Sequence, residues 1–213
     1  MGTAVFLVAG AIAFGGGCLA RSRYERDCLV TEEYRIVSEK IHGPGKTIVF
    51  LTDLHNKEFG DQNCRLLDAV RKVKPDAVLS GGDGMVAKKG NSDVEIPRKL
   101  LTELAKEFPV YCGNGNHECR MVWKSDIYGA AYENYQAALE NAGIRYLANG
   151  SADLDGEIRI YGLDLPKSAY LPRSGQIPEN LLKDALGEPD PGRFNLLLAH
   201  SPLSVSYTHL TLP

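Results

Sequence analysis

The sequence lacks an excess of positive charge, because its 24 lysines and arginines are outnumbered by 27 aspartates and glutamates. Proteins that bind nucleic acid need a basic surface, so nucleic acid is not an expected partner. Cysteine is also scarce: the chain has five, and no two of them have CxxC spacing. That number and spacing argue against a zinc knuckle and against a disulfide framework. We therefore expect reduced thiols with structural roles.

The length of the chain limits the number of domains. With 213 residues, it can form one domain with a sizeable core, whereas two complete domains would be cramped. We predict a single globular domain over residues 27–204, preceded by an N-terminal segment (residues 1–26) and followed by a tail (residues 205–213).

The N-terminal segment carries no charge over residues 3–20, and Arg21, Arg23 and Arg26 follow. An uncharged run of this length is about the minimum that can span a bilayer, so we predict a membrane anchor with a transmembrane helix. A secretory signal peptide is the alternative, although no lysine or arginine precedes the run. Lipid modification of Cys18 is a third possibility. By the positive-inside rule, the three arginines place the globular domain in the cytoplasm.

The tail, residues 205–213, matches a one-frame translation of the transposon-end adapter used in sequencing libraries. We therefore predict that it is not native and that the globular domain is truncated at its C-terminus. A segment that was never selected to pack should also be poorly ordered.

Apolar runs typical of strands alternate with segments of helical periodicity. The continuously apolar run at residues 47–51 predicts a strand buried on both faces, at the centre of a sheet. Helical spacing of leucine and valine predicts helices over residues 63–73, 94–108 and 128–141. Residues 34–37 alternate between polar and apolar side chains and predict a half-buried strand.

Later in the chain the pattern changes. Residues 144–163 form short strand-like runs that are interrupted by Asn149-Gly150 and Asp155-Gly156. Both dipeptides are typical of hairpin turns. The first part of the chain therefore predicts parallel crossovers, and this part predicts antiparallel pairing. We expect a mixed α/β sandwich with a partly antiparallel second sheet.

Polar side chains follow five of the strand-like runs. In open α/β sheets, ligands bind beyond the carboxyl ends of the strands, so these side chains should converge on one crevice. Carboxylate, amide and imidazole groups in such a crevice predict a metal site. The residues are Asp53 and His55; Asp83; Asn116, His117 and Glu118; Asp164; and His200.

Each of these motifs, taken alone, has an ordinary structural explanation. An Asp-x-His triplet such as Asp53-Leu54-His55 arises easily by chance. The glycines around Asp83 are typical of a tight turn. His200 follows four aliphatic residues and resembles a hydrogen-bonded core histidine. The ordered occurrence of these motifs, each after a strand, is what favours metal binding.

As an ordered set, the motifs resemble those of the calcineurin-like metallophosphoesterase superfamily. The resemblance covers residues 47–202 and is carried by Asp53-x-His55, Gly82-Asp83, Gly115-Asn116-His117-Glu118 and His200-x-Pro202.

This resemblance implies a four-layer α/β/β/α sandwich that holds two divalent metal ions. His117 would face the substrate as the catalytic residue. Membrane-anchored members that hydrolyse lipid-linked or small phosphoesters look most similar. The implied metal ligands are Asp53 and His55 for the first ion, Asn116 and His200 for the second, and Asp83 as the bridge between them.

Such a site would hydrolyse a phosphoester with metal-activated water, while His117 stabilises or protonates the leaving oxygen. The substrate would be a phosphomonoester, a phosphodiester, or a lipid- or nucleotide-linked pyrophosphate. Oxygen and nitrogen ligands without thiolate suit Mn²⁺, Fe or Zn²⁺. The alternatives are an inactive scaffold of the same fold and a membrane-tethered interaction protein.

The chain departs from the superfamily in one respect, because it has no Gly-His-x-His motif after His200. That motif supplies one further histidine to each metal ion. The segment Tyr207-Thr208-His209-Leu210 lacks the glycine and the second histidine, so His209 is not assigned as a ligand. We expect the chain as written to be impaired as an enzyme.

Overall fold

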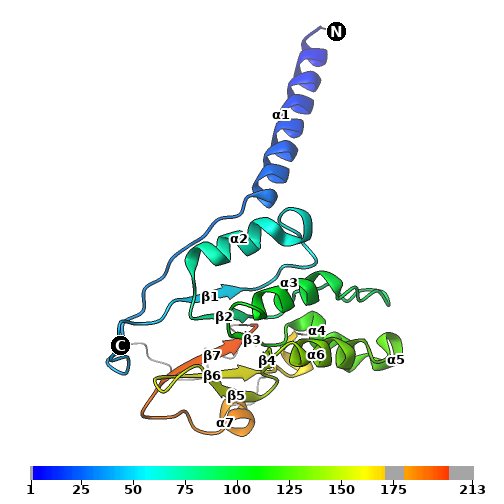
Figure 1. Ribbon diagram of the computed structural model, residues 1–213. Helices are drawn as coiled ribbons and strands as arrows, with labels where there is room; N and C mark the ends of the chain where they lie inside the picture. Colours follow the sequence, from blue (N-terminus) through cyan, green and yellow to red (C-terminus); the bar gives the residue numbers. More distant parts are fainter. Residues whose placement is uncertain (1, 171–179, 202–213) are drawn as a thin grey trace. The chain divides into compact units, whose positions relative to one another are not determined.

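The computed structural model describes residues 2–170 and 180–201, with side chains from Phe14 onward (Figure 1). The adapter-like tail and Pro202 lie outside the described residues. By its internal contacts the chain divides into two compact units, residues 1–34 and residues 35–213. The first unit is built on helix α1 (Gly2–Asp27).

Helix α1 contains the segment for which the sequence predicts a membrane anchor or signal. The side chains of residues 1–13, which make up most of the uncharged run, lie outside the described part. Among the residues that were described, no helix is both long enough and apolar enough to cross a bilayer.

The second unit contains a parallel sheet of four strands in the order β1-β2-β3-β4. Its central strands, β2 and β3, are buried on both faces. Strand β1 pairs only with β2 within the described residues, and its Phe50 is 55% exposed. The prediction that this apolar strand lies at the centre of the sheet is therefore wrong. The strands are β1 (Ile48–Leu51), β2 (Ala77–Ser80), β3 (Val110–Cys112) and β4 (Arg145–Tyr146).

A second sheet has the order β5-β6-β7 and is mixed. Strands β5 (Gly150–Asp153) and β6 (Ile158–Leu163) form an antiparallel hairpin around Asp155-Gly156, as predicted. Strand β7 (Phe194–Ala199) pairs with β6 in parallel. The other predicted hairpin signal, Asn149-Gly150, instead leads from the first sheet into the second.

The two sheets pack face to face, and helices cover their outer faces. Figure 1 shows α2 and α3 beyond the first sheet and α7 beyond the second. The predicted α/β sandwich with a partly antiparallel second sheet is confirmed. The core between the sheets contains Ala77, Leu79 and Tyr111 from the first sheet and Ile158, Ile160 and Leu198 from the second. Leu147, between β4 and β5, completes it.

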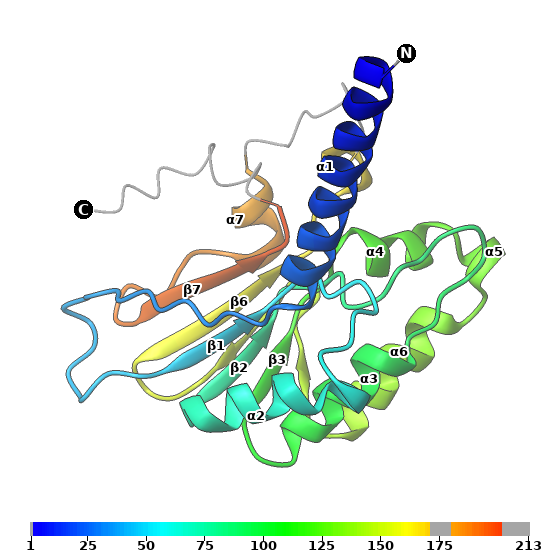
Figure 2. The same ribbon diagram turned by 90° about the horizontal axis from the view of Figure 1, so that it is seen from above.

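Figure 2 shows the helices α2, α3 and α6 beside the first sheet, and each begins and ends close to its predicted position. Most of their leucines and tyrosines, with Val70, recur at helical spacing and are buried, which fixes the face that each helix turns inward, whereas Val73 at the end of α2 is exposed. Burial of such side chains stabilises the fold by roughly 1.5–3 kcal/mol each. The helices are α2 (Cys64–Val73), preceded by the 3₁₀ turn η1 (Asp61–Asn63), α3 (Glu95–Ala105) and α6 (Ala131–Asn141).

The structure contains four further short elements that were not predicted from the sequence. Helix α4 (Asn116–Trp123) begins inside the Gly-Asn-His-Glu motif, and α5 (Ser125–Tyr128) follows it. The 3₁₀ turn η2 (Lys167–Tyr170) and helix α7 (Leu181–Leu186) contribute to a small apolar cluster around Leu163, Leu165 and Ala169.

Residues 34–37 do not form the predicted strand. They have no regular secondary structure, and Tyr34, Ile36 and Val37 are exposed. An alternating pattern describes which side chains face a core, but a strand also needs a neighbour for its backbone groups. No such neighbour lies beside this segment in the described part of the chain.

Candidate metal centre

The loops that follow β1 and β2 lie side by side and carry the first three candidate ligands. The Asp53 backbone N–H donates to Gly82 O over 3.1 Å, and the His55 N–H donates to Asp83 O over 2.9 Å. The two loops therefore continue the parallel pairing of their strands. Because of this pairing, Asp53, His55 and Asp83 lie at the carboxyl edge of the first sheet, where the sequence predicted them.

Asp83 is the more enclosed of the two carboxylates in the donor groups, with 2% of its surface exposed. Its Oδ1 accepts the backbone N–H of His117 at 2.8 Å, and its Oδ2 lies 3.3 Å from His200 Nε2. Burial alone would raise the pKa of Asp83, but the hydrogen bonds from His200 and His117 outweigh it and lower the pKa. Asp83 is therefore held as an anion between two loops, as a bridging ligand must be.

His200 follows β7 and reaches the first sheet from the second. Its Nδ1 lies 3.0 Å from the carbonyl oxygen of Gly81, so this nitrogen carries a proton and donates. That arrangement turns Nε2 toward the carboxylates, 4.0 Å from Asp53 Oδ1. A histidine that donates from Nδ1 to a carbonyl is oriented to bind metal through Nε2.

The same histidine balances negative charge when no cation is bound. Its hydrogen bond to Asp83 raises the pKa of His200 to about 9, although burial opposes this shift. At neutral pH a proton therefore lies between His200 and Asp83. Ligands must lose such protons before they bind a metal ion, so cation binding here would release a proton.

The donor atoms form two groups that share Asp83. One group contains His55, Asp83 and His117, and the other contains Asp53, Asp83 and His200; within each, the ligand atoms lie within 4.8 Å of one another. His55 Nε2 also lies 3.5 Å from Asp53 Oδ1, which links the groups. The resemblance paired Asp53 with His55, whereas here Asp53 and His55 belong to different groups, although their side chains are close to each other.

Asn116 lies at the start of α4 and faces Asp83. One end of its amide group lies 3.0 Å from Asp83 Oδ2, and the other end lies 3.1 Å from the His117 backbone nitrogen. Both contacts are hydrogen bonds only when the amide nitrogen faces the carboxylate. With the amide oxygen toward Asp83, the side chain instead offers a cation ligand beside the carboxylate.

His117 differs from His200 in the partner of its Nδ1. The backbone N–H of Ala87 donates to His117 Nδ1 over 3.0 Å, and Arg120 Nη1 lies 3.4 Å from the same atom. A nitrogen that accepts hydrogen bonds carries no proton, so in the neutral ring the proton is on Nε2. Burial, with a contribution from Arg120, lowers the pKa of His117 and so favours this neutral form. The geometry thus makes His117 Nε2 a hydrogen-bond donor.

Glu118 belongs to the Gly-Asn-His-Glu motif, and the sequence predicts no specific role for it. It is 2% exposed and accepts three backbone N–H groups, from Asp83 at 2.9 Å, Gly84 at 3.2 Å and Gly115 at 3.0 Å. Burial, and then the charge of Asp83, raise the pKa of Glu118 to about 7. Glu118 therefore joins the loop of Asp83 to the loop of Asn116 and His117.

We expect Glu118→Gln to loosen the centre although it preserves the shape of the side chain. The amide has one acceptor oxygen, so at least one buried N–H would face an NH₂ donor, at a cost of about 1–3 kcal/mol. Thermal unfolding should therefore occur at a lower temperature, and Mn²⁺ should raise the midpoint less than in the parent. Glu103→Gln, on the exposed side of α3, is the matched control. Equal midpoints for Glu118→Gln and this control would contradict the assignment.

The roles of two further residues, Arg120 and Asp164, differ from those predicted from the sequence. Arg120, which carried no motif, donates to Ala87 O at 2.8 Å and lies beside His117. Asp164, which was a candidate ligand, accepts a hydrogen bond from Asn114 at 2.8 Å and belongs to neither donor group. The sequence contained one indication that Arg120 lies beside His117. The two residues are three positions apart, and side chains at this spacing are neighbours on a helix.

The backbone of the centre is unusual in its dihedral angles. Asp53, His55 and Asp83 have φ of 57°, 49° and 51°, the left-handed region that few residues other than glycine adopt. Gly82 has φ of 90° and passes so close to the next loop that a Cβ there would lie 2.0 Å from the Gly115 nitrogen. Only glycine permits this approach.

The donor set suits divalent cations. Carboxylate oxygens and imidazole nitrogens converge without thiolate, a combination that binds Mn²⁺, Fe or Zn²⁺. Asp83, shared by both groups and buried, lies where a carboxylate can contact two cations. The residues present therefore fit the metal centre that the sequence predicts.

Comparison with protein families supports the same interpretation. The family model described as calcineurin-like phosphoesterase matches residues 46–211. Comparison of the chain with curated proteins gives no match. The matched region contains every residue of the two donor groups.

Proposed function

The chain belongs to the calcineurin-like phosphoesterase family, and from this membership we propose that it hydrolyses a phosphoester at a binuclear metal centre. The observation that carries the proposal is the pair of donor groups that share the buried Asp83. The family generally binds divalent metal ions, and the ligand set leaves Mn²⁺, Fe and Zn²⁺ as candidates. A phosphoester is the proposed partner of the site.

Bound cations would polarise the phosphoryl oxygens and activate water. The protein would hold them with Asp83 between the two ions and with Asp53, His55, Asn116 and His200 around them. The buried Asp83 also fixes the separation of the loops, because it accepts the His117 backbone N–H. Without that bond, the helix that carries Asn116 and His117 would be linked to the loop of Asp83 chiefly through Glu118.

His117 is proposed as the residue that assists the leaving group. Hydrolysis breaks the bond between phosphorus and the leaving oxygen, and that oxygen must acquire a proton. The attacking water supplies that proton. Because the Ala87 N–H and Arg120 occupy His117 Nδ1, the Nε2–H of the neutral ring remains to donate a hydrogen bond that stabilises the charge on the leaving oxygen. This hydrogen-bond pattern favours His117 as a donor to the substrate over His117 as a metal ligand.

The test is a comparison of metal binding with turnover. We expect the purified chain, which lacks a Gly-His-x-His motif, to hydrolyse bis(4-nitrophenyl) phosphate slowly but measurably with Mn²⁺. This activity should be lost with EDTA and regained when Mn²⁺ is restored. His117→Ala should keep most of the rise in melting temperature that Mn²⁺ produces but lose about 10²–10³-fold in turnover, the range for one hydrogen-bond donor to a developing negative charge.

His42→Ala provides the control, because His42 lies outside both donor groups. If Mn²⁺ raises neither the melting temperature nor the rate, the proposal fails and the scaffold alternative is favoured. If His117→Ala loses the response to Mn²⁺ altogether, His117 is a ligand and its role as a donor is wrong.

A further inference from the structure

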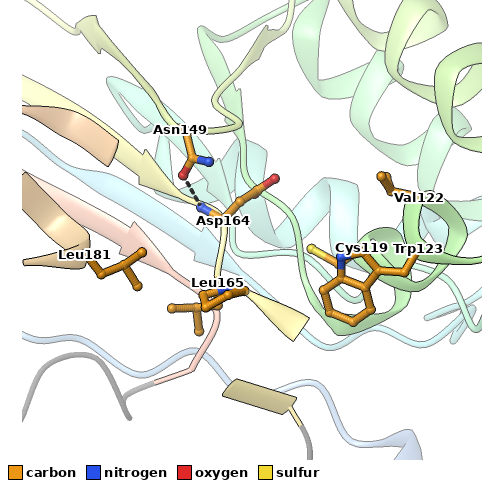
Figure 3. A pocket seen from close by; sticks show the side chains of 8 residues that line it. Cys119, Val122, Trp123, Asn149, Asp164, Leu165 and Leu181 are labelled. Atoms are coloured by element: carbon orange, nitrogen blue, oxygen red, sulfur yellow. Dashed lines mark hydrogen bonds between the residues drawn. The ribbon is translucent and has the colours of Figure 1, made fainter. Parts of the chain in front are cut away.

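A pocket of about 270 Å³ lies at the far end of α4 from the metal-site residues. Figure 3 shows Trp123 on one side, with Leu165 and Leu181 on the other. Asp164 lies between them, and its backbone N–H donates to Asn149 Oδ1 over 2.9 Å. The function proposed above uses none of these side chains.

The pocket is close to the centre because one helix carries residues of both. Asn116 and His117 form the first turn of α4, and Trp123 is its last residue. At 1.5 Å per residue, six residues separate His117 from Trp123 by about 9 Å along the axis. The ring of Tyr170 is near residues of both the pocket and the centre. Its centroid lies 5.6 Å from that of Trp123 in the pocket and 6.3 Å from that of His200 in the centre. The pocket therefore lies about 9 Å from His117 along the helix, a distance that a substituent of a substrate bound at the centre would cover.

The chemistry of the walls selects against negative charge. Leucine, proline, valine and tryptophan supply most of the lining, and none of the eight lining residues is a lysine or an arginine. The one ionisable carboxyl group, Asp164, would repel a second phosphate. A nucleotide or a pyrophosphate group needs cations or N–H groups around its oxygens, and this lining offers no cation.

Asp164 also defines what the pocket accepts. Its Oδ2 is bonded to Asn114, whereas its buried Oδ1 has no hydrogen-bond partner among the described residues. A buried acceptor without a donor is unfavourable, so a ligand that brings a hydroxyl or amide N–H would relieve that cost after a small movement of the carboxyl group.

The volume limits the size of the ligand. Pockets that enclose a drug-sized molecule measure about 300–1,000 Å³, and a cavity of about 150 Å³ holds benzene. At about 270 Å³ the pocket would hold one ring or a short branched chain. It is too small for a nucleoside or a complete lipid.

We propose that this pocket binds the leaving group of the substrate, and that this group is a small, neutral, largely apolar alcohol with a hydrogen-bond donor for Asp164. The inference rests on the proposed function, since the leaving group is defined by that reaction. Water adds its oxygen to phosphorus, the bond from phosphorus to the alcohol oxygen breaks, and the alcohol departs with a proton released by that water. His117 Nε2–H donates a hydrogen bond that stabilises the charge on the departing oxygen. Esters of nucleotides and pyrophosphates would be poor substrates.

A fluorescence titration tests the pocket without requiring turnover, because Trp123 is the only tryptophan of the chain. The probes are cyclohexylmethanol, which is neutral and carries a donor, and cyclohexanecarboxylate, an anion of the same size. We expect a saturable change in Trp123 emission, with the alcohol bound at least tenfold more tightly than the anion. Asp164→Asn should reduce this preference, and Leu165→Asn should remove binding of the alcohol. Ile127→Asn, at an exposed position outside the pocket lining, should change neither.

A kinetic comparison then separates the two proposals. With Mn²⁺, cyclohexylmethyl phosphate should have a KM at least tenfold below that of methyl phosphate, and Trp123→Ala should remove most of this difference. Equal KM values, or equal binding of the alcohol and the anion, would overturn the leaving-group assignment while leaving the proposed hydrolysis intact. Saturable binding of the alcohol without metal-dependent turnover of either ester would overturn the hydrolytic function instead.

Discussion

Asp83→Asn should abolish the response of the protein to divalent cations. A neutral amide in place of the shared carboxylate weakens both donor groups at once, and Asp83 is buried where no other side chain can replace it. We expect the rise in melting temperature with Mn²⁺ to disappear and metal-dependent hydrolysis to fall by more than a hundredfold. Stabilisation by a ligand follows RT ln(1 + [L]/Kd), so a thermal titration measures the lost affinity directly.

The control for this substitution is Asp68→Asn, the same chemical change at an exposed position on α2. This variant should bind Mn²⁺ as the parent does. Metal content by elemental analysis provides a second measurement that does not depend on activity. Undiminished metal content and turnover in Asp83→Asn would show that the cations are held elsewhere.

Gly82→Ala should destabilise the protein and disorganise the centre together. An added Cβ would meet the backbone of the neighbouring loop, 2.0 Å from the Gly115 nitrogen, in a conformation with φ of 90°. The backbone must move, because the obstacle is not a flexible side chain. The cost should be about 3 kcal/mol or more. In a domain of this size, that loss corresponds to a fall of roughly 6–12 °C in melting temperature.

Gly156→Ala is the matched control, since nothing lies within 4 Å of a Cβ at Gly156. We expect its melting temperature to stay within about 2 °C of the parent, as for an ordinary surface substitution. Circular dichroism would follow both transitions, with Mn²⁺ added to a second set of samples. A Gly82→Ala variant as stable and as responsive to Mn²⁺ as Gly156→Ala would refute the close approach of the two loops.

The sequence predicted whether a segment is a helix or a strand better than it predicted which elements lie next to each other. Helical spacing located α2, α3 and α6 because each helix buries one face. The apolar residues of that face recur every three or four positions, a pattern that can be recognised in the sequence. The apolar run of β1 indicated burial but not how many strands flank it, and β1 proved to be an edge strand of the described sheet. Residues 34–37 alternate as a strand does, yet pairing depends on a distant segment that a local pattern cannot report.

The candidate site shows the same limit. The ordered motifs predicted that Asp53, Asp83 and His200 would meet, because the ends of parallel strands share an edge. The role of Glu118 in joining two loops could not be predicted from the sequence. It depends on three backbone N–H groups that come together only in the folded chain. The tautomer of His117 likewise depends on Ala87, which is thirty residues away and has no functional side chain.

The left-handed backbone of Asp53, His55 and Asp83 implies a trade-off between stability and activity. At each position an L-residue costs about 1–2 kcal/mol relative to its ordinary conformation, and glycine would relieve that cost. Glycine would also remove a side chain that the cations need. Replacement of these three residues by glycine would therefore raise folding stability while removing donor atoms of the proposed metal centre.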